Sequence, residues 1–127
     1  MPTILLVEDH PDVLNVLAEG MAEEFHMVTA HNGAEALAYL TRAKHDIDAA
    51  ILDWTLPDML GIELLRALRN HQMQAPVLFL SGYRFPPEAL AAAPCVPKPC
   101  TARELCERVW TMLARTPDHV ARIAVAA

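Results

Sequence analysis

The sequence lacks the features of a membrane, secreted or nucleic-acid-binding protein. No apolar run approaches the roughly 18 residues that a membrane span requires, and the apolar start of the chain soon reaches Glu8 and Asp9 with no basic flank, unlike a signal peptide. The ten lysines and arginines are outnumbered by sixteen acidic residues and form no basic block, which argues against a DNA- or RNA-binding domain. We therefore expect a cytoplasmic protein that contacts neither membrane nor nucleic acid.

Glycine and cysteine are also scarce. The chain of 127 residues has four glycines and no low-complexity linker, and 54% of it is hydrophobic, which predicts a single domain with a real core. The three cysteines, Cys95, Cys100 and Cys106, are an odd number at spacings that match no common zinc motif. Reduced, unreactive thiols are the expected state.

Short apolar runs alternate with amphipathic stretches five times along the chain. The runs that predict strands lie at residues 3–7, 27–30, 49–52, 76–80 and, more weakly, 95–97. The stretches that follow them place apolar side chains on one helical face, and two pairs, Asn32 with Glu35 and Thr101 with Glu104, have the spacing of a capping box at a helix start. This alternation predicts a doubly wound α/β domain, in which helices cover both faces of a parallel sheet.

Polar residues follow four of the five apolar runs. Glu8 and Asp9 follow the first, Asp53 the third, Ser81 the fourth and Lys98 the fifth. Because the carboxyl ends of parallel strands meet at one edge of the sheet, we expect these side chains to share a site.

The chemistry of such a cluster is specific. Three carboxylates held close together repel one another, so each resists ionisation unless a positive charge compensates. Mg²⁺ suits such a cluster, because it takes carboxylate oxygens, keeps several waters and accepts phosphate oxygens. One carboxylate can then attack phosphorus while Lys98 balances charge and the Ser81 hydroxyl donates a hydrogen bond, which predicts phosphoryl transfer through an acyl phosphate.

Several segments resemble the receiver domain of two-component response regulators. They are ILLVED at residues 4–9, HNGAEAL at 31–37, ILDWTLPDMLG at 51–61, LSGY at 80–83 and VPKP at 96–99. The resemblance extends over residues 3 to 114, with the motifs in the family's order. It implies a flavodoxin-like fold with a five-stranded parallel sheet in the order 2-1-3-4-5.

The resemblance also implies a metal site. Asp53 matches the phosphoacceptor of the family, and Glu8 and Asp9 match the acidic pair that binds Mg²⁺ together with it. Thr55 occupies the position whose backbone carbonyl completes the metal site.

Two further residues are assigned by the resemblance. Ser81 matches the switch hydroxyl and Lys98 the family's lysine, and the bond between Lys98 and Pro99 is often cis in this family. Family members take a phosphoryl group from a phosphohistidine on a sensor histidine kinase or a histidine phosphotransfer protein. They then change shape near the fourth and fifth strands, and for this chain we expect a downstream protein target, which the sequence does not identify.

The segment between Ser81 and Lys98 departs from the family pattern. Cys95 stands three residues before Lys98, where receivers usually carry an aromatic residue; Tyr83 and Phe85 are candidate substitutes. Only sixteen residues, 82–97, fill the interval, and four of them are prolines, so residues 87–93 predict about two helical turns. We expect this segment to be mobile and to be ordered by phosphorylation or by a partner.

We expect the receiver domain to occupy residues 1–115 and a short C-terminal tail to occupy 116–127, and the start at Met1 favours a whole protein. Two alternatives stay open: a receiver module cut from a hybrid histidine kinase, and a pseudo-receiver that binds partners without phosphorylation.

A separate enzyme is not expected, because aspartate-based phosphatases place a second acid two residues after the nucleophile, where this chain has Thr55. A flavin-mononucleotide protein is not expected either, because the acidic residues after the first strand would repel its phosphate. Trp54, beside Asp53, is expected to be partly exposed and to report metal binding by its fluorescence.

Overall fold

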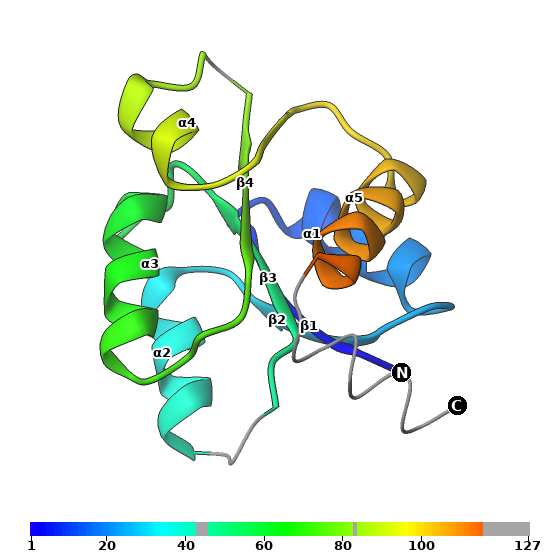
Figure 1. Ribbon diagram of the computed structural model, residues 1–127, viewed down its shortest axis with the longest axis horizontal. Coiled ribbons are helices and arrows are strands. Elements are labelled where there is room, and N and C mark those ends of the chain that lie inside the picture. The colour runs from blue at the N-terminus through cyan, green and yellow to red at the C-terminus, as the bar shows by residue number, and fades with distance from the viewer. Residues whose placement is uncertain (43–45, 83, 116–127) are drawn as a thin grey trace.

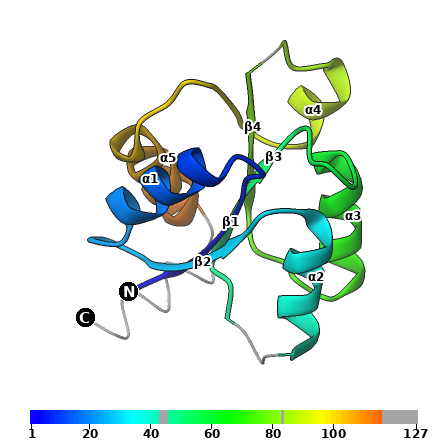
Figure 2. The same cartoon turned by 180° about the vertical axis from the view of Figure 1, so that it is seen from behind.

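The computed structural model describes residues 1–42, 46–82 and 84–115, and within them a parallel sheet lies between two layers of helices (Figure 1, with the reverse view in Figure 2). The strands are β1 (Thr3–Val7), β2 (His26–Ala30), β3 (Ala49–Asp53), β4 (Val77–Ser81) and β5 (Cys95–Pro97). The helices are α1 (Pro11–Met21), α2 (Gly33–Arg42), α3 (Gly61–Asn70), α4 (Pro87–Ala92) and α5 (Ala102–Ala114). The strand order β2-β1-β3-β4-β5 confirms the expected flavodoxin-like fold.

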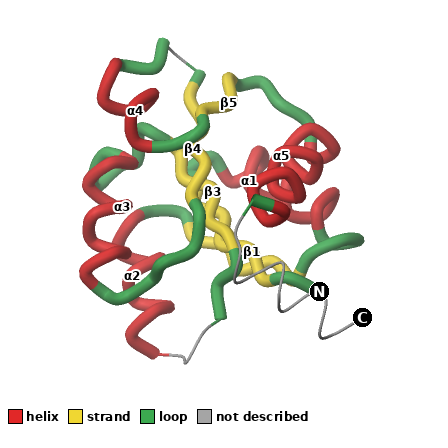
Figure 3. The backbone as a smooth tube through the Cα atoms, in the orientation of Figure 1, coloured by secondary structure: helices red, strands yellow, loops and turns green. Residues whose placement is uncertain are grey.

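The apolar strands are covered on both faces. Helices α1 and α5 lie on one face, and α2, α3 and α4 lie on the other (Figure 3). In β1, Ile4 and Leu6 pack under α1 and α5, whereas Leu5 and Val7 pack under α2 and α3, and all four are fully buried. This double burial explains why β1, β3 and β4 are nearly continuous apolar runs in the sequence.

The helix starts follow the local signals in part. Thr101 and Glu104 form the predicted capping box on α5, since the Glu104 N–H donates to the Thr101 hydroxyl at 3.1 Å and the Thr101 N–H donates to the Glu104 carboxylate at 3.4 Å. On α2, the Glu35 N–H donates to the Asn32 side chain at 2.8 Å. The Glu35 carboxylate turns instead to His31, so only half of this capping box forms.

The helix and the strand that follow β4 are short, as expected. Helix α4 has six residues and β5 has three, and Ala89 is the residue of α4 that is buried in the core. The predicted mobility of residues 82–97 stays a prediction; Tyr83 and the tail at 116–127 lie outside the described residues. None of the helices within the described ranges is long and apolar enough to cross a membrane.

Candidate functional site

The carboxyl ends of β1 and β3 bring three carboxylates together. Glu8 directly follows β1 and is 1% exposed, and its backbone N–H donates to the carbonyl of Ala30 at 3.0 Å. Asp53 is the last residue of β3 and is 4% exposed, whereas Asp9 is open to solvent. One oxygen from each of Glu8, Asp9 and Asp53 lies within 4.8 Å of the other two. The predicted carboxylate cluster is therefore present at this edge.

Lys98 supplies the positive charge of the site. Its Nζ donates to the two carboxylate oxygens of Glu8 at 2.9 and 2.7 Å and to Oδ2 of Asp53 at 2.9 Å. Its backbone N–H donates to the carbonyl of Ser81 at 2.8 Å, which extends the pairing of β4 and β5 by one residue and fixes the lysine over the sheet edge. Ser81 itself is buried at the end of β4, so the structure brings all four strand ends to one place.

The burial of the site changes its protonation equilibria. Burial raises the pKa of Asp53 to about 6, and Glu8 adds to this rise while Lys98 opposes it. Burial acts to lower the pKa of Lys98, but its hydrogen bonds to Glu8 and Asp53 raise it above its ordinary value. The ammonium is therefore firmly protonated near neutral pH.

The loop between β3 and α3 folds back against the site. The Gly61 N–H donates to the carbonyl of Trp54 at 2.6 Å, and Thr55 pairs with Leu60 across an antiparallel bridge. A Cβ at Gly61 would lie 2.7 Å from the backbone oxygen of Asp53, so this close approach requires glycine. Thr55 is exposed, and its N–H donates to Oδ1 of Asp53 at 3.4 Å, which places its backbone beside the carboxylate.

A sequence model described as the response regulator receiver domain matches residues 4–110, which is most of the chain. The chain belongs to this family. It is 35% identical over 122 residues to the transcriptional regulatory protein CpxR of Escherichia coli, and these residues cover 91% of this chain and 51% of CpxR. It is 34% identical over 118 residues to a probable cyclic di-GMP phosphodiesterase of Vibrio cholerae, covering 87% of this chain and 26% of that protein. The chain thus spans about half or less of the length of these curated relatives.

The receiver fold also matches solved structures. The response regulator protein TrrA of Thermotoga maritima, solved in complex with Mg²⁺ and BeF, is 31% identical with a TM-score of 0.74. The match covers 88% of this chain and 99% of that one. Receiver domains bind Mg²⁺ at an acidic site, and the donors of the cluster at Glu8, Asp9 and Asp53 fit this ion, because all three are carboxylate oxygens of the kind that a small, hard cation prefers.

The expected partial exposure of Trp54 is wrong. Its side chain is 7% exposed and packs edge-on against Phe79, with ring centroids 5.2 Å apart. Trp54 belongs to the core cluster that includes Ile62 and Leu65 of α3, and this packing could not be deduced from its position beside Asp53. The expectation that Trp54 fluorescence reports metal binding stays a prediction.

The region that carries the switch aromatic in other receivers has a different composition here. Cys95 is half-buried, and its thiol lies 3.4 Å from the carbonyl of Ala93. Phe85 is half-buried and packs against the core under α3 and α4, so it is the candidate aromatic within the described residues. Tyr83, the other candidate, falls outside them.

The three cysteines lie in surroundings that disfavour their thiolate form. Burial raises the pKa of Cys95 and of Cys100, and it raises the pKa of Cys106 to about 12. The thiolate, which is the reactive form, is thus suppressed at all three positions. Among the described residues no disulfide joins them.

Two features of the site were not predicted from the sequence. An apolar groove of about 460 Å³ lies between α1 and the segment that follows β5, where Val13 and Val16 face Pro99 and Cys100 beside Lys98. In addition, Asp58 in the loop after β3 contacts the start of α2. The motif at 51–61 contained this aspartate, but no local spacing connects it with a partner 25 residues away.

Proposed function

We propose that this receiver domain is a phosphorylation-dependent switch in which Asp53 takes a phosphoryl group from the phosphohistidine of a sensor histidine kinase or a histidine phosphotransfer protein. A carboxylate oxygen of Asp53 forms the bond to phosphorus as the N–P bond breaks, and the departing imidazole keeps the electron pair. The observation that carries the proposal is the meeting of three carboxylates within 4.8 Å, with the Lys98 ammonium 2.9 Å from Asp53.

Each residue of the site has a separate role in the proposal. Glu8, Asp9, Asp53 and the backbone carbonyl of Thr55 would hold Mg²⁺, which supplies charge neutralisation for the phosphoryl oxygens. Lys98 pairs with the phosphoryl group once Asp53 no longer carries a free carboxylate. The hydroxyl of Ser81, at the adjacent strand end, donates to the same group and carries the change toward residues 82–97.

The groove beside Lys98 supports a protein as the phosphoryl donor. Val16 is 67% exposed and lines the groove together with Val13, so an apolar surface adjoins the acidic site. A donor protein that presents a phosphohistidine to Asp53 would cover this surface and bury it.

In this proposal, residues 1–115 form the switch and residues 116–127 form a tail. The domain accepts the phosphoryl group on its own Asp53 and does not convert a separate substrate. Output then takes place through contacts with a downstream protein. Because the curated relatives are longer than this chain, their whole-protein activities are not transferred to it, and a module of a longer hybrid kinase is the alternative. A cytoplasmic location stays a prediction.

The test is phosphorylation of the purified protein by acetyl phosphate, followed by intact mass with and without Mg²⁺. The expected result is a gain of one phosphoryl group that requires Mg²⁺ and is lost in Asp53→Asn. Asp12→Asn, which removes an exposed carboxylate from the first turn of α1, is the matched control and should be phosphorylated normally. Mg²⁺ binding without phosphorylation by acetyl phosphate or by a phosphohistidine protein would favour the pseudo-receiver over the switch.

A further inference from the structure

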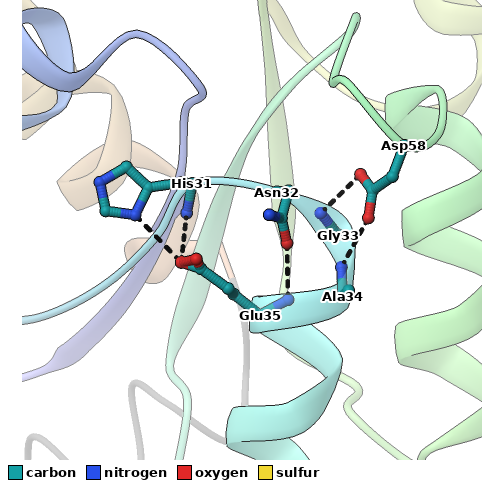
Figure 4. Close-up of polar contacts among 6 residues, drawn as sticks. All are labelled: His31, Asn32, Gly33, Ala34, Glu35 and Asp58. Atoms are coloured by element: carbon teal, nitrogen blue, oxygen red, sulfur yellow. Dashed lines mark hydrogen bonds and ion pairs between the residues drawn. The ribbon is translucent and has the colours of Figure 1, made fainter.

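The loop between β3 and α3 is tied at its tip to the first turn of α2. Oδ1 of Asp58 accepts a hydrogen bond from the Gly33 N–H at 3.0 Å, and Oδ2 accepts one from the Ala34 N–H at 2.9 Å (Figure 4). Both oxygens of one carboxylate are used, one for each N–H. The contact joins two connections at the carboxyl edge of the sheet, the one after β2 and the one after β3.

The Asp58 carboxylate caps two N–H groups of the first turn of α2. The first N–H groups of a helix have no partner within the helix, and Asn32 satisfies that of Glu35 alone. The N–H groups of Gly33 and Ala34 are satisfied by Asp58, at the helix end where negative charge is favoured. Partial burial acts to raise the pKa of Asp58, but the two hydrogen bonds hold it below its ordinary value, so the carboxylate stays ionised.

The same contact fixes the loop that carries Thr55. The base of the loop is closed by the hydrogen bond from Gly61 to Trp54 at 2.6 Å, and its middle is closed by one from the Leu56 N–H to the Met59 carbonyl at 3.1 Å. These bonds lie within the loop and its ends, so they set its shape. The bonds of Asp58 run to another element and set where the loop tip lies relative to the rest of the sheet edge.

We propose that Asp58 is a positioning residue for the metal site, which holds the carbonyl of Thr55 in place for Mg²⁺ through the start of α2. The inference rests on the proposed function, since it concerns the affinity of that site for its ion. Mg²⁺ demands near-ideal octahedral geometry. If the Thr55 carbonyl is not held in position, a smaller fraction of the molecules is able to bind the ion. The apparent dissociation constant rises in inverse proportion to that fraction.

The test is titration of the metal-free protein with MgCl₂ by isothermal calorimetry, together with urea unfolding of each variant. Asp58→Ala is expected to weaken Mg²⁺ binding by about three- to tenfold. Asp58→Asn keeps one acceptor oxygen, so its loss should be smaller. Asn32→Ala is the matched control: it removes a cap from the same helix and lowers stability, but it leaves the tether of the loop intact and should bind Mg²⁺ as the wild type does.

A second comparison separates positioning from simple loss of negative charge. Asp58→Asn and Asp58→Ala remove the same charge, so an equal loss in both that disappears at high salt would indicate electrostatics and overturn the inference. Wild-type affinity in Asp58→Ala, or an equal weakening in Asn32→Ala, would overturn it as well. In each of these cases the proposed function survives, whereas a wild-type protein that binds no Mg²⁺ would remove both.

Discussion

Replacing Asp53 by asparagine is expected to stabilise the metal-free protein, even though it destroys the proposed phosphoacceptor. Asp53 is 4% exposed and shares the site with the carboxylates of Glu8 and Asp9. One ammonium, that of Lys98, bonds to both Glu8 and Asp53. The carboxylate of Asp53 is therefore ionised at a cost to the folded state, and a neutral amide of the same shape avoids this cost.

The size of the effect follows from the pKa of Asp53. Burial raises it from 3.8 to about 6, a difference that corresponds to about 3 kcal/mol as an upper bound. We expect Asp53→Asn to gain roughly 1–3 kcal/mol, which for a domain of this size raises Tm by about 3–5 °C per kcal/mol.

The stabilisation by Asp53→Asn is expected to increase with pH. At acid pH near the unfolded pKa of 3.8 and below it, Asp53 is protonated in both the folded and the unfolded chain, so the penalty is small. As pH rises toward the folded pKa of about 6, the unfolded chain loses the proton first and the folded state becomes relatively less stable. Above that pH the whole penalty applies, so the advantage of the asparagine should grow between these two values and then level off.

The assay is thermal and urea unfolding with EDTA, at about pH 4 and about pH 7.5. Asp46→Asn, which removes an exposed carboxylate before β3, is the control and should change little at either pH. Saturating Mg²⁺ should shrink the difference, because the ion stabilises the wild type through a ligand that the variant lacks. An Asp53→Asn protein that is no more stable than the wild type at the higher pH in EDTA would refute the reasoning.

Two predictions concern backbone conformation. Gly61→Ala places a Cβ 2.7 Å from the backbone oxygen of Asp53 and 3.0 Å from the Cα of Trp54, so we expect a loss of about 1–3 kcal/mol in urea unfolding; Gly82→Ala meets no atom within 4 Å and should cost much less. Gln72 follows α3 with a φ of 65°, and Gln72→Gly should gain about 0.5 kcal/mol because glycine adopts this conformation without a steric cost. An unchanged stability in either variant would contradict the corresponding backbone geometry.

The parallel sheet was predictable because the apolar runs identify each strand, whereas the strand order came only from the resemblance to receiver domains. The predicted strands at 49–52 and 76–80 end one residue too early, since Asp53 and Ser81 are the last residues of β3 and β4. A polar residue at a strand end looks like the start of a loop in the sequence. In the structure both continue the strand, and this places them in the buried interior of the site.

The contacts that the sequence did not predict are non-local. Asp58 reaches the start of α2 across 25 residues, and Trp54 is buried in the core against Phe79 of β4. The half-formed capping box shows the same limit, because the Glu35 carboxylate has a choice between Asn32 and His31, and spacing alone does not decide it. The site residues at the strand ends could still be predicted, because the carboxyl ends of parallel strands meet at one edge of the sheet whichever contacts the loops make.

The ion pairs of Lys98 also fix the electrical balance of the site. Three carboxylates against one ammonium leave two formal negative charges at the sheet edge when all four groups are ionised. A divalent cation makes this edge electroneutral, whereas a monovalent ion leaves one negative charge. A phosphoryl group on Asp53 would replace one negative charge by nearly two. Phosphorylation would then change the local charge of the site as well as its shape. A partner protein with a positively charged side chain at this edge would distinguish the phosphorylated form from the unphosphorylated one.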